Sequence, residues 1–246
     1  MRAVMLGATR GMGRALARRM VERGDRVFLL GNDADDLERS AADLEARGRN
    51  RSKVEFTYCD LESPEGFEPA LAAADAGLIG FDTVILSAAI FAGAEQVDGD
   101  SALAERLLTV DFTHTVLFCE IARKWLLERG GGTLCVFSSV AGDRARKPTS
   151  LYGAAKAGLT HYLENLDLRF RDQGLVTLCV KPGFVKTGMT EGLKPPPFAG
   201  EPDGVAKDVL KAIDRQRAVL YTPLAWRAVM LVIRNLPKFV MRRLNF

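Results

Sequence analysis

The 246-residue sequence lacks the residue patterns of a metalloprotein, a disulfide-linked secreted domain or a membrane-spanning protein. Its four cysteines are scattered with no Cys-x-x-Cys pair, which excludes the common zinc and thiol-redox motifs and favours buried thiols. It has only two histidines, His114 and His161, and neither lies near other ligand-type side chains, so we predict no metal site. No apolar run approaches the roughly 20 residues that a membrane-spanning helix requires.

The beginning of the chain leaves no room for a secretory leader, because the first apolar run starts at Ala3. We therefore predict a cytoplasmic location. The hydrophobic fraction of 48% and the charged fraction of 26% are those of an ordinary globular protein, and the length suits one α/β domain. No nucleic-acid-binding module is recognisable, so we expect no nucleic-acid partner.

Acidic residues are absent from the tail that follows Asp214. The tail has seven cations, which exceed the net charge of +3 and leave the rest of the chain mildly acidic: Arg215, Arg217, Arg227, Arg234, Lys238, Arg242 and Arg243. From residue 223 onward it is also apolar, with the aromatic residues Trp226, Phe239 and Phe246. This pattern favours an amphipathic element on an anionic membrane surface, and the alternative is a helix packed on the body or on a partner subunit.

Short apolar runs alternate with amphipathic segments along the chain. Strands are expected at 3–6, 27–30, 54–58, 84–87, 133–137, 176–180 and 219–221, and helices at 14–23, 34–47, 64–76, 101–129, 150–172 and 202–215. We expect Asp33 and Ser101 to cap helices. This repetition predicts an α/β fold of one Rossmann domain, a doubly wound parallel sheet with helices on both faces, over residues 1–222. Residues 223–246 would form a C-terminal extension.

Glycines cluster directly after the first expected strand, in Gly7-Ala8-Thr9-Arg10-Gly11-Met12-Gly13. Glycine permits a tight turn and a close approach of ligand to backbone, and the N-terminus of the helix that follows attracts a pyrophosphate. In this strand–turn–helix context the turn predicts a dinucleotide site at the carboxyl end of the sheet, where such folds bind ligands.

Tyr152 and Lys156 lie one turn apart on the same face of the helix expected at 150–172. A nearby ammonium favours the phenolate and lowers a pKa that is about 10 in water. Ser139 follows the strand at 133–137, where its hydroxyl can hydrogen-bond a carbonyl oxygen that Tyr152 protonates. The three residues predict acid–base chemistry on a carbonyl or a secondary alcohol.

Taken in this order, these features resemble the short-chain dehydrogenase/reductase family along nearly the whole chain. The resemblance implies a nicotinamide-dependent enzyme in which Ser139, Tyr152 and Lys156 are catalytic and Lys156 also holds the nicotinamide ribose. Besides Tyr152 and Lys156, it implies cofactor contacts at Gly7, Thr9, Arg10, Gly11, Met12, Gly13, Asn32, Asp60, Leu61, Ala88, Ala89, Pro182, Gly183, Val185 and Thr187.

Besides the threonine before the glycine turn, which is Leu6 here, two features depart from the family pattern. The family's Asn-Asn-Ala-Gly is Leu86-Ser87-Ala88-Ala89 here, and its fourth catalytic residue, an asparagine, is Asp111. In the family, the backbone carbonyl of this asparagine anchors a water that leads to the lysine. That role would survive the change to Asp111. The added carboxylate is expected to pair with Lys156 and to alter the pKa of Tyr152.

The cofactor is expected to be NADP rather than NAD. NAD-specific enzymes place an acid after the second strand to bind the ribose 2′-hydroxyl, and Gly31 and Asn32 stand there instead. Asp33 lies two residues after Gly31, the position at which that acid is expected. Arg10 is well placed for a 2′-phosphate.

The segment 188–200 contains three consecutive prolines and three glycines, which exclude a regular helix or strand. The family resemblance makes it a mobile lid over the substrate. The basic run Arg144, Arg146 and Lys147 and the tail are similar to those of one branch of the family. Enzymes of that branch reduce decaprenylphosphoryl-2-keto-ribose, a ketone that an oxidase partner makes. We therefore predict a lipophilic or lipid-linked ketone as substrate, reduced at the inner face of the cell membrane.

Two other functions fit the same residues. One is a soluble reductase of small ketones or 3-oxoacyl groups, and the other is a dinucleotide-binding regulator without turnover. The family commonly pairs through the helices expected at 101–129 and 150–172, so the resemblance implies a homodimer or homotetramer.

Overall fold

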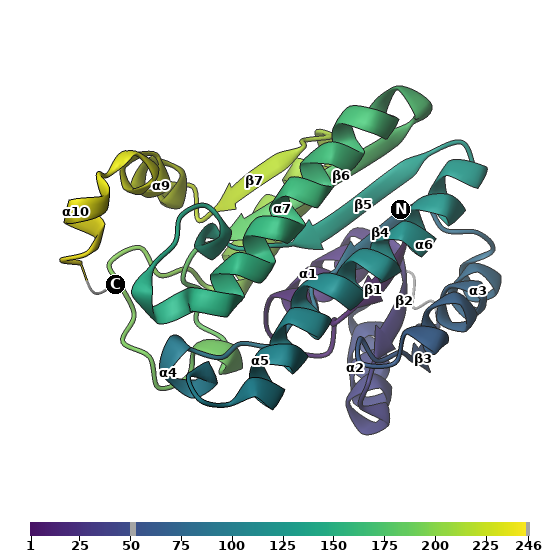
Figure 1. The fold of residues 1–246 in the computed structure, drawn as a ribbon. Helices are drawn as coiled ribbons and strands as arrows, with labels where there is room; N and C mark the ends of the chain where they lie inside the picture. Colours follow the sequence, from purple (N-terminus) through teal and green to yellow (C-terminus); the bar gives the residue numbers. More distant parts are fainter. Residues whose placement is uncertain (50–52, 245–246) are drawn as a thin grey trace.

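The structure is a computed structural model that describes residues 1–49 and 53–244 and confirms the expected α/β architecture (Figure 1). In these residues seven parallel strands form one sheet in the order β3-β2-β1-β4-β5-β6-β7. The strands are β1 (Arg2–Leu6), β2 (Arg26–Gly31), β3 (Glu55–Tyr58), β4 (Thr83–Leu86), β5 (Gly132–Phe137), β6 (Leu175–Pro182) and β7 (Val219–Thr222). The strand order reverses between β1 and β4, which is where doubly wound sheets bind dinucleotides.

Helices cover both faces of the sheet (Figure 1). One layer contains α1 (Gly11–Arg23), α2 (Ala34–Arg47) and α8 (Pro202–Asp214), and the other contains α3 (Phe67–Leu78), α6 (Thr115–Glu128) and α7 (Ser150–Phe170). Successive side chains along a strand point to opposite faces of the sheet. Val4 therefore packs against the layer that contains α6, and Met5 against the layer that contains α1. Each fully buried large side chain contributes about 1.5–3 kcal/mol.

The four cysteines are buried free thiols, as expected from their positions in or beside apolar runs. No group of three or more His, Cys, Asp or Glu side chains that could hold a metal ion is found in the described residues. Within those same ranges, no helix is long and apolar enough to span a membrane.

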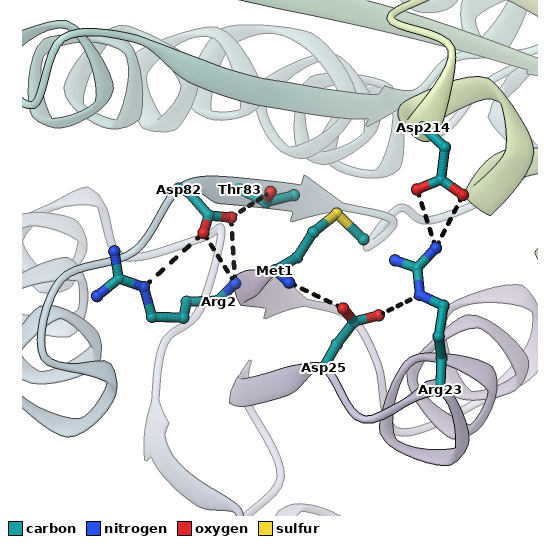
Figure 2. A network of polar contacts seen from close by, with 7 residues as sticks. All are labelled: Met1, Arg2, Arg23, Asp25, Asp82, Thr83 and Asp214. Atoms are coloured by element: carbon teal, nitrogen blue, oxygen red, sulfur yellow. Dashed lines mark hydrogen bonds and ion pairs between the residues drawn. The ribbon is translucent and has the colours of Figure 1, made fainter.

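Charged groups at the amino ends of the strands are paired with one another (Figure 2). Asp25 accepts from the Met1 ammonium at 2.8 Å and from Arg23 Nε at 2.7 Å, and Arg23 also holds both oxygens of Asp214 at 2.9 Å. These contacts join the start of β1 to the ends of α1 and α8. We call this side of the sheet the amino edge, and the opposite side, with the predicted ligand site, the carboxyl edge.

The long helix expected at 101–129 is divided into three parts. It comprises α5 (Ser101–Leu108), a π-helical segment (Thr109–His114) and α6. Ser101 is not its N-cap, because Asp100 stands one residue earlier and its carboxylate accepts from the Leu103 amide at 2.9 Å. The cap expected at Asp33 is confirmed by a 2.9 Å bond from the Asp36 amide.

The tail packs against the body through one face of α9 (Ala225–Asn235), which α10 (Lys238–Met241) follows. Trp226, Met230 and Ile233 form a small core with Val140. Trp226 is therefore not available to a membrane surface, contrary to the sequence-based expectation. Phe239 is exposed, and Phe246 lies outside the described residues. A short helix that the sequence analysis did not predict, α4 (Ala94–Val97), lies beside the carboxyl edge.

Candidate active site

The glycine-rich turn folds tightly between β1 and α1. Gly7 has φ of 93°, and a Cβ there would lie 2.4 Å from the Ala88 amide nitrogen after β4. A Cβ on Gly13 would lie 2.3 Å from the Gly7 carbonyl oxygen. Side chains are thus excluded at both positions. The first turn of α1 has no acidic residue and Arg10 provides no side-chain cap, so the free N–H groups suit a diphosphate.

A cleft of about 590 Å³ opens over this turn. Its lining brings together most of the predicted cofactor residues: Gly7, Thr9, Arg10, Gly11, Met12, Gly13, Asn32, Asp60, Leu61, Ala88, Ala89 and Thr187. Gly188, Met189 and Glu191, at the start of the segment expected to be a lid, also line it. An elongated ligand that lies along these residues would run from the end of β2 across the switch point to the lid.

The three predicted catalytic residues meet next to this cleft, although none of them lines it. The link is Asp111, which contacts Lys156 and accepts from the amide of Ile90 in the cleft wall. Lys156 is 1% exposed, and its ammonium lies 5.5 Å from the centre of the Tyr152 ring. Ser139 Oγ accepts a 3.1 Å bond from the Ala141 amide, and the Ser139 hydroxyl also hydrogen-bonds the Tyr152 side chain, so the two hydroxyl groups lie together. The structure therefore places an acid, a cation and a hydroxyl donor around one position, as carbonyl reduction requires.

The neighbouring hydroxyl, Ser138, has a different role. It is buried, donates to the Lys156 carbonyl at 3.0 Å and contacts Thr160 Oγ1 at 2.8 Å. These bonds fix the α7 backbone at the position of the lysine. Of the two serines, Ser138 is occupied within the fold, which leaves Ser139 as the one that a substrate could reach.

Asp111 lies in the π-helical segment and is fully buried. Its Oδ1 accepts from the Ile90 amide at 2.8 Å, and its Oδ2 lies 3.4 Å from the Lys156 ammonium. The expected pairing with the lysine is present. The side chain also ties the segment after β4 to α7, a connection that a backbone carbonyl could not make.

Burial controls the acidity of both groups that flank the lysine. It raises the pKa of Tyr152 above its usual value, against the lowering effects of the Lys156 ammonium and the Ser139 hydroxyl. The Asp111 charge adds to the rise. Burial also raises the pKa of Asp111, although the Lys156 charge opposes it. The phenol is therefore held in its protonated form, the form that a general acid needs for reduction.

Arg10, expected at the 2′ position of the cofactor, is already paired. Its Nε donates to Asp36 Oδ2 at 2.6 Å, and its guanidinium lies 3.9 Å from Asp33. Arg39 donates to the other oxygen of Asp36 at 2.6 Å. A 2′-phosphate would therefore meet two arginines that share one carboxylate.

The segment after β6 contributes to the site unevenly. Of the four residues predicted there, Thr187 lines the cleft, whereas the Val185 side chain is 3% exposed and belongs to the core. Gly183 is covered by Trp226, since a Cβ on it would lie 2.2 Å from the indole. The indole N–H donates to the Phe198 carbonyl at 3.0 Å. The tail thus holds both the end of β6, at Pro182 and Gly183, and the segment 188–200.

Some residues at the site were missed by sequence reasoning. Phe91 packs edge-on against Tyr152 with ring centroids 5.0 Å apart. Arg106 and Glu62 line the cleft and form a 2.6 Å ion pair across it. Phe91 could have been predicted, because it follows the strand expected at 84–87 and so lies at the carboxyl edge. The Arg106 and Glu62 pair comes from elements far apart in the chain and had no such signal.

The comparisons with known proteins agree with this geometry. The sequence pattern of the short chain dehydrogenase family matches residues 1–197. An uncharacterized oxidoreductase of Mycobacterium tuberculosis is 34% identical over 98% of this chain and 96% of its own. One of Streptomyces coelicolor is also 34% identical, over 98% and 94%. The chain belongs to the short-chain dehydrogenase family and is an NAD(P)-dependent short-chain oxidoreductase.

Solved structures support the fold. A short-chain dehydrogenase/reductase from Mycobacterium ulcerans superposes with a TM-score of 0.80 at 20% identity, over 89% of this chain and 86% of that one. An actinorhodin polyketide ketoreductase variant crystallised with NADPH gives 0.80 at 22% identity, over 89% and 94%. These likenesses establish the Rossmann architecture.

Proposed function

We propose that the protein is an NADP-dependent carbonyl reductase that delivers a hydride to a ketone, with Tyr152 as general acid. The observation that carries this proposal is the meeting of Tyr152, Lys156 and Ser139 beside a cleft whose glycine turn excludes side chains. The tight turn and the uncapped start of α1 fit a dinucleotide diphosphate. The reduced nicotinamide supplies the hydride when it is bound.

Side chains of the protein supply the proton to the carbonyl oxygen. Tyr152 Oη donates its proton to the carbonyl oxygen as negative charge develops there, and the Ser139 hydroxyl donates a hydrogen bond to the same oxygen. The Lys156 ammonium then stabilises the phenolate, and Asp111 keeps the lysine in position through the 3.4 Å contact. The alternative of a non-catalytic regulator is disfavoured because all four groups are in place.

NADP is the proposed cofactor because Gly31 and Asn32 offer no acid to a 2′-hydroxyl, while Arg10 and Arg39 lie on either side of Asp36. The experiment compares dissociation constants for NADPH and NADH by fluorescence titration. Arg10→Ala should weaken NADPH by roughly 10-fold and leave NADH unchanged, since a charged hydrogen bond contributes about 1.5–3 kcal/mol. Asp36→Asn should strengthen NADPH by freeing Arg10. Equal binding of both cofactors that does not respond to Arg10→Ala would refute the preference.

The proposed substrate is lipophilic, and the proposed place of reaction is a cytoplasmic, anionic membrane face. Exposed apolar side chains gather on the lid and the tail: Met189, Leu193 and Phe198, and Leu224, Leu231, Val232 and Phe239. On α9 the exposed Leu231 and Val232 alternate with the cations Arg227 and Arg234. Apolar side chains flanked by cations suit an anionic lipid surface. A polyprenylphosphoryl keto-sugar, formed by an oxidase partner, fits this setting.

Co-sedimentation with phosphatidylglycerol vesicles tests the membrane proposal. The double variant Leu231→Glu/Val232→Glu should lose vesicle binding and retain activity on a water-soluble ketone. Ile79→Glu is the matched control, because Ile79 is 77% exposed at the end of α3 and far from the tail. Equal sedimentation of the double variant and the wild type would favour the soluble reductase.

The proposed oligomer is a homodimer or homotetramer formed through α5–α6 and α7. Leu117 on α6 and Leu168 on α7 are 44% and 78% exposed, so each of these helices offers an apolar side chain to a partner subunit. Sedimentation velocity of the wild type and of Leu168→Glu tests it, with dissociation expected in the variant. A monomeric wild type would rule the proposal out.

A further inference from the structure

Arg146 is a half-buried arginine whose Nε is buried without an acceptor. Three arginines in the described ranges have a buried Nε with no hydrogen-bond partner, and they are Arg14, Arg123 and Arg146. Arg14 and Arg123 still pair through another nitrogen, with Asp43 at 3.4 Å and with Glu120 at 2.6 Å. Arg146 forms no ion pair with any described residue. A guanidinium that is partly withdrawn from water without an anion is costly, and an anionic ligand would offset that cost.

The segment that carries Arg146 gives it no internal anion. Its carboxylate, Asp143, is already held by Lys181 Nζ at 2.7 Å and by the Tyr221 hydroxyl at 2.6 Å. The neighbouring cation Arg144 donates to the Leu236 carbonyl at 2.9 Å and so secures the tail. The sequence analysis treated Arg144 and Arg146 as parts of one basic run. The structure separates them, because Arg144 is used within the fold and Arg146 is not.

Arg146 lies on the segment that joins two of the reacting residues, Ser139 and Tyr152. The segment runs from Ser139 to the start of α7, where Tyr152 stands, and the positive charge of Arg146 lowers the pKa of the Tyr152 phenol. Burial lowers the pKa of Arg146 itself, and Tyr152 is the group that favours its charge. Thr149 Oγ1, three residues further on, is also buried without a partner. A second polar group is thus open on the same segment.

We propose that Arg146 binds an oxyanion of the substrate, a phosphate or a carboxylate, and that Thr149 supplies a second hydrogen bond to it. The inference rests on the proposed carbonyl reduction, since it places the anion within reach of Tyr152. The substrate is then an anionic ketone whose charged group lies close to its carbonyl. A polyprenylphosphoryl keto-sugar and a soluble keto-acid or keto-phosphate share this chemistry.

Binding to the NADP-loaded protein tests the inference without turnover. Isothermal titration would compare dihydroxyacetone phosphate with dihydroxyacetone, acetoacetate with methyl acetoacetate, and farnesyl phosphate with farnesol. In the wild type the anion of at least one pair should bind about 10- to 100-fold more tightly than its neutral partner, as a charge-assisted bond predicts. Arg146→Met should abolish that preference and Arg146→Lys should keep part of it. Arg217→Met, an exposed arginine at the amino edge, is the matched control.

Each outcome has a defined meaning. Preference for farnesyl phosphate would identify a lipid phosphate, and preference for a small anion would identify a soluble substrate. No anion preference in the wild type, or the same preference in Arg146→Met, would overturn the inference. Turnover of neutral ketones that is indifferent to Arg146→Met would leave the reductase intact while the anion site fails. Anion binding without turnover of any ketone would support the anion site and contradict the proposed carbonyl reduction.

Discussion

Two groups of buried polar side chains, one at each edge of the sheet, differ in how completely they are paired. At the amino edge, Asp25 is 8% exposed in its side chain and has two cationic partners within 2.8 Å (Figure 2). At the carboxyl edge, Arg146 Nε and Thr149 Oγ1 are buried with no partner, and Asp111 Oδ2 has only the 3.4 Å contact with Lys156. Polar groups satisfied within the fold contribute stability, whereas unsatisfied ones at a cleft are left for a ligand.

Tyr152→Phe, at the carboxyl edge, should have the largest effect on activity. Removing the phenolic proton should lower kcat by about 100- to 10,000-fold, since that is the usual contribution of a general acid. NADPH binding and the free energy of unfolding should change little. The measurement is NADPH oxidation with the best ketone found, beside a fluorescence titration. Tyr162→Phe is the control, because Tyr162 lies on the same helix and donates to Glu120, away from the cleft. Comparable losses in both variants would mean that the effect is structural.

Asp25→Asn should have the opposite profile. It weakens the bonds to Met1 and Arg23, so the free energy of unfolding should fall by about 1–3 kcal/mol, while kcat/KM stays within twofold. Urea denaturation followed by circular dichroism measures the first, and steady-state kinetics the second. Asp214→Asn, at a side chain that is 53% exposed, should cost under about 1 kcal/mol. A large catalytic defect in Asp25→Asn would break the proposed division between the edges.

Arg146→Met should stabilise the protein in the absence of ligand. The change removes an unpaired, partly buried charge and keeps the aliphatic volume, so the free energy of unfolding should rise by about 1 kcal/mol. Binding of anionic ketones should be lost in the same variant. Differential scanning calorimetry with and without NADP measures the first effect. A destabilised Arg146→Met that folds normally would show that the guanidinium has an internal partner, contrary to the interpretation above.

The sequence was sufficient for the features that depend on local spacing. Glycines between a strand and a helix, and Tyr152 four residues before Lys156, imply their geometry because chain connectivity fixes it. The capping of α5 was misplaced by one residue, since Asp100 and Ser101 are both good caps and only the backbone decides between them. The contact of Trp226 with Gly183 and the isolation of Arg146 were not predictable. Both depend on how the tail and the segment after Ser139 pack, and neither arrangement leaves a periodic trace in the sequence.

The smallest expected effect concerns Asp111. The carboxylate raises the pKa of Tyr152, so Asp111→Asn should lower that pKa while the amide oxygen still accepts from the Ile90 N–H. Reduction needs the protonated phenol, and its rate is lost as the pH rises through the Tyr152 pKa. The alkaline limb of the kcat profile should therefore move to lower pH in the variant, with the plateau at lower pH nearly unchanged. A limb that moves to higher pH would mean that Asp111 acts mainly by holding Lys156, whose displacement would remove the cation that favours the phenolate. The direction of the shift thus decides whether the carboxylate influences the proton donor by its charge or by its grip on the lysine.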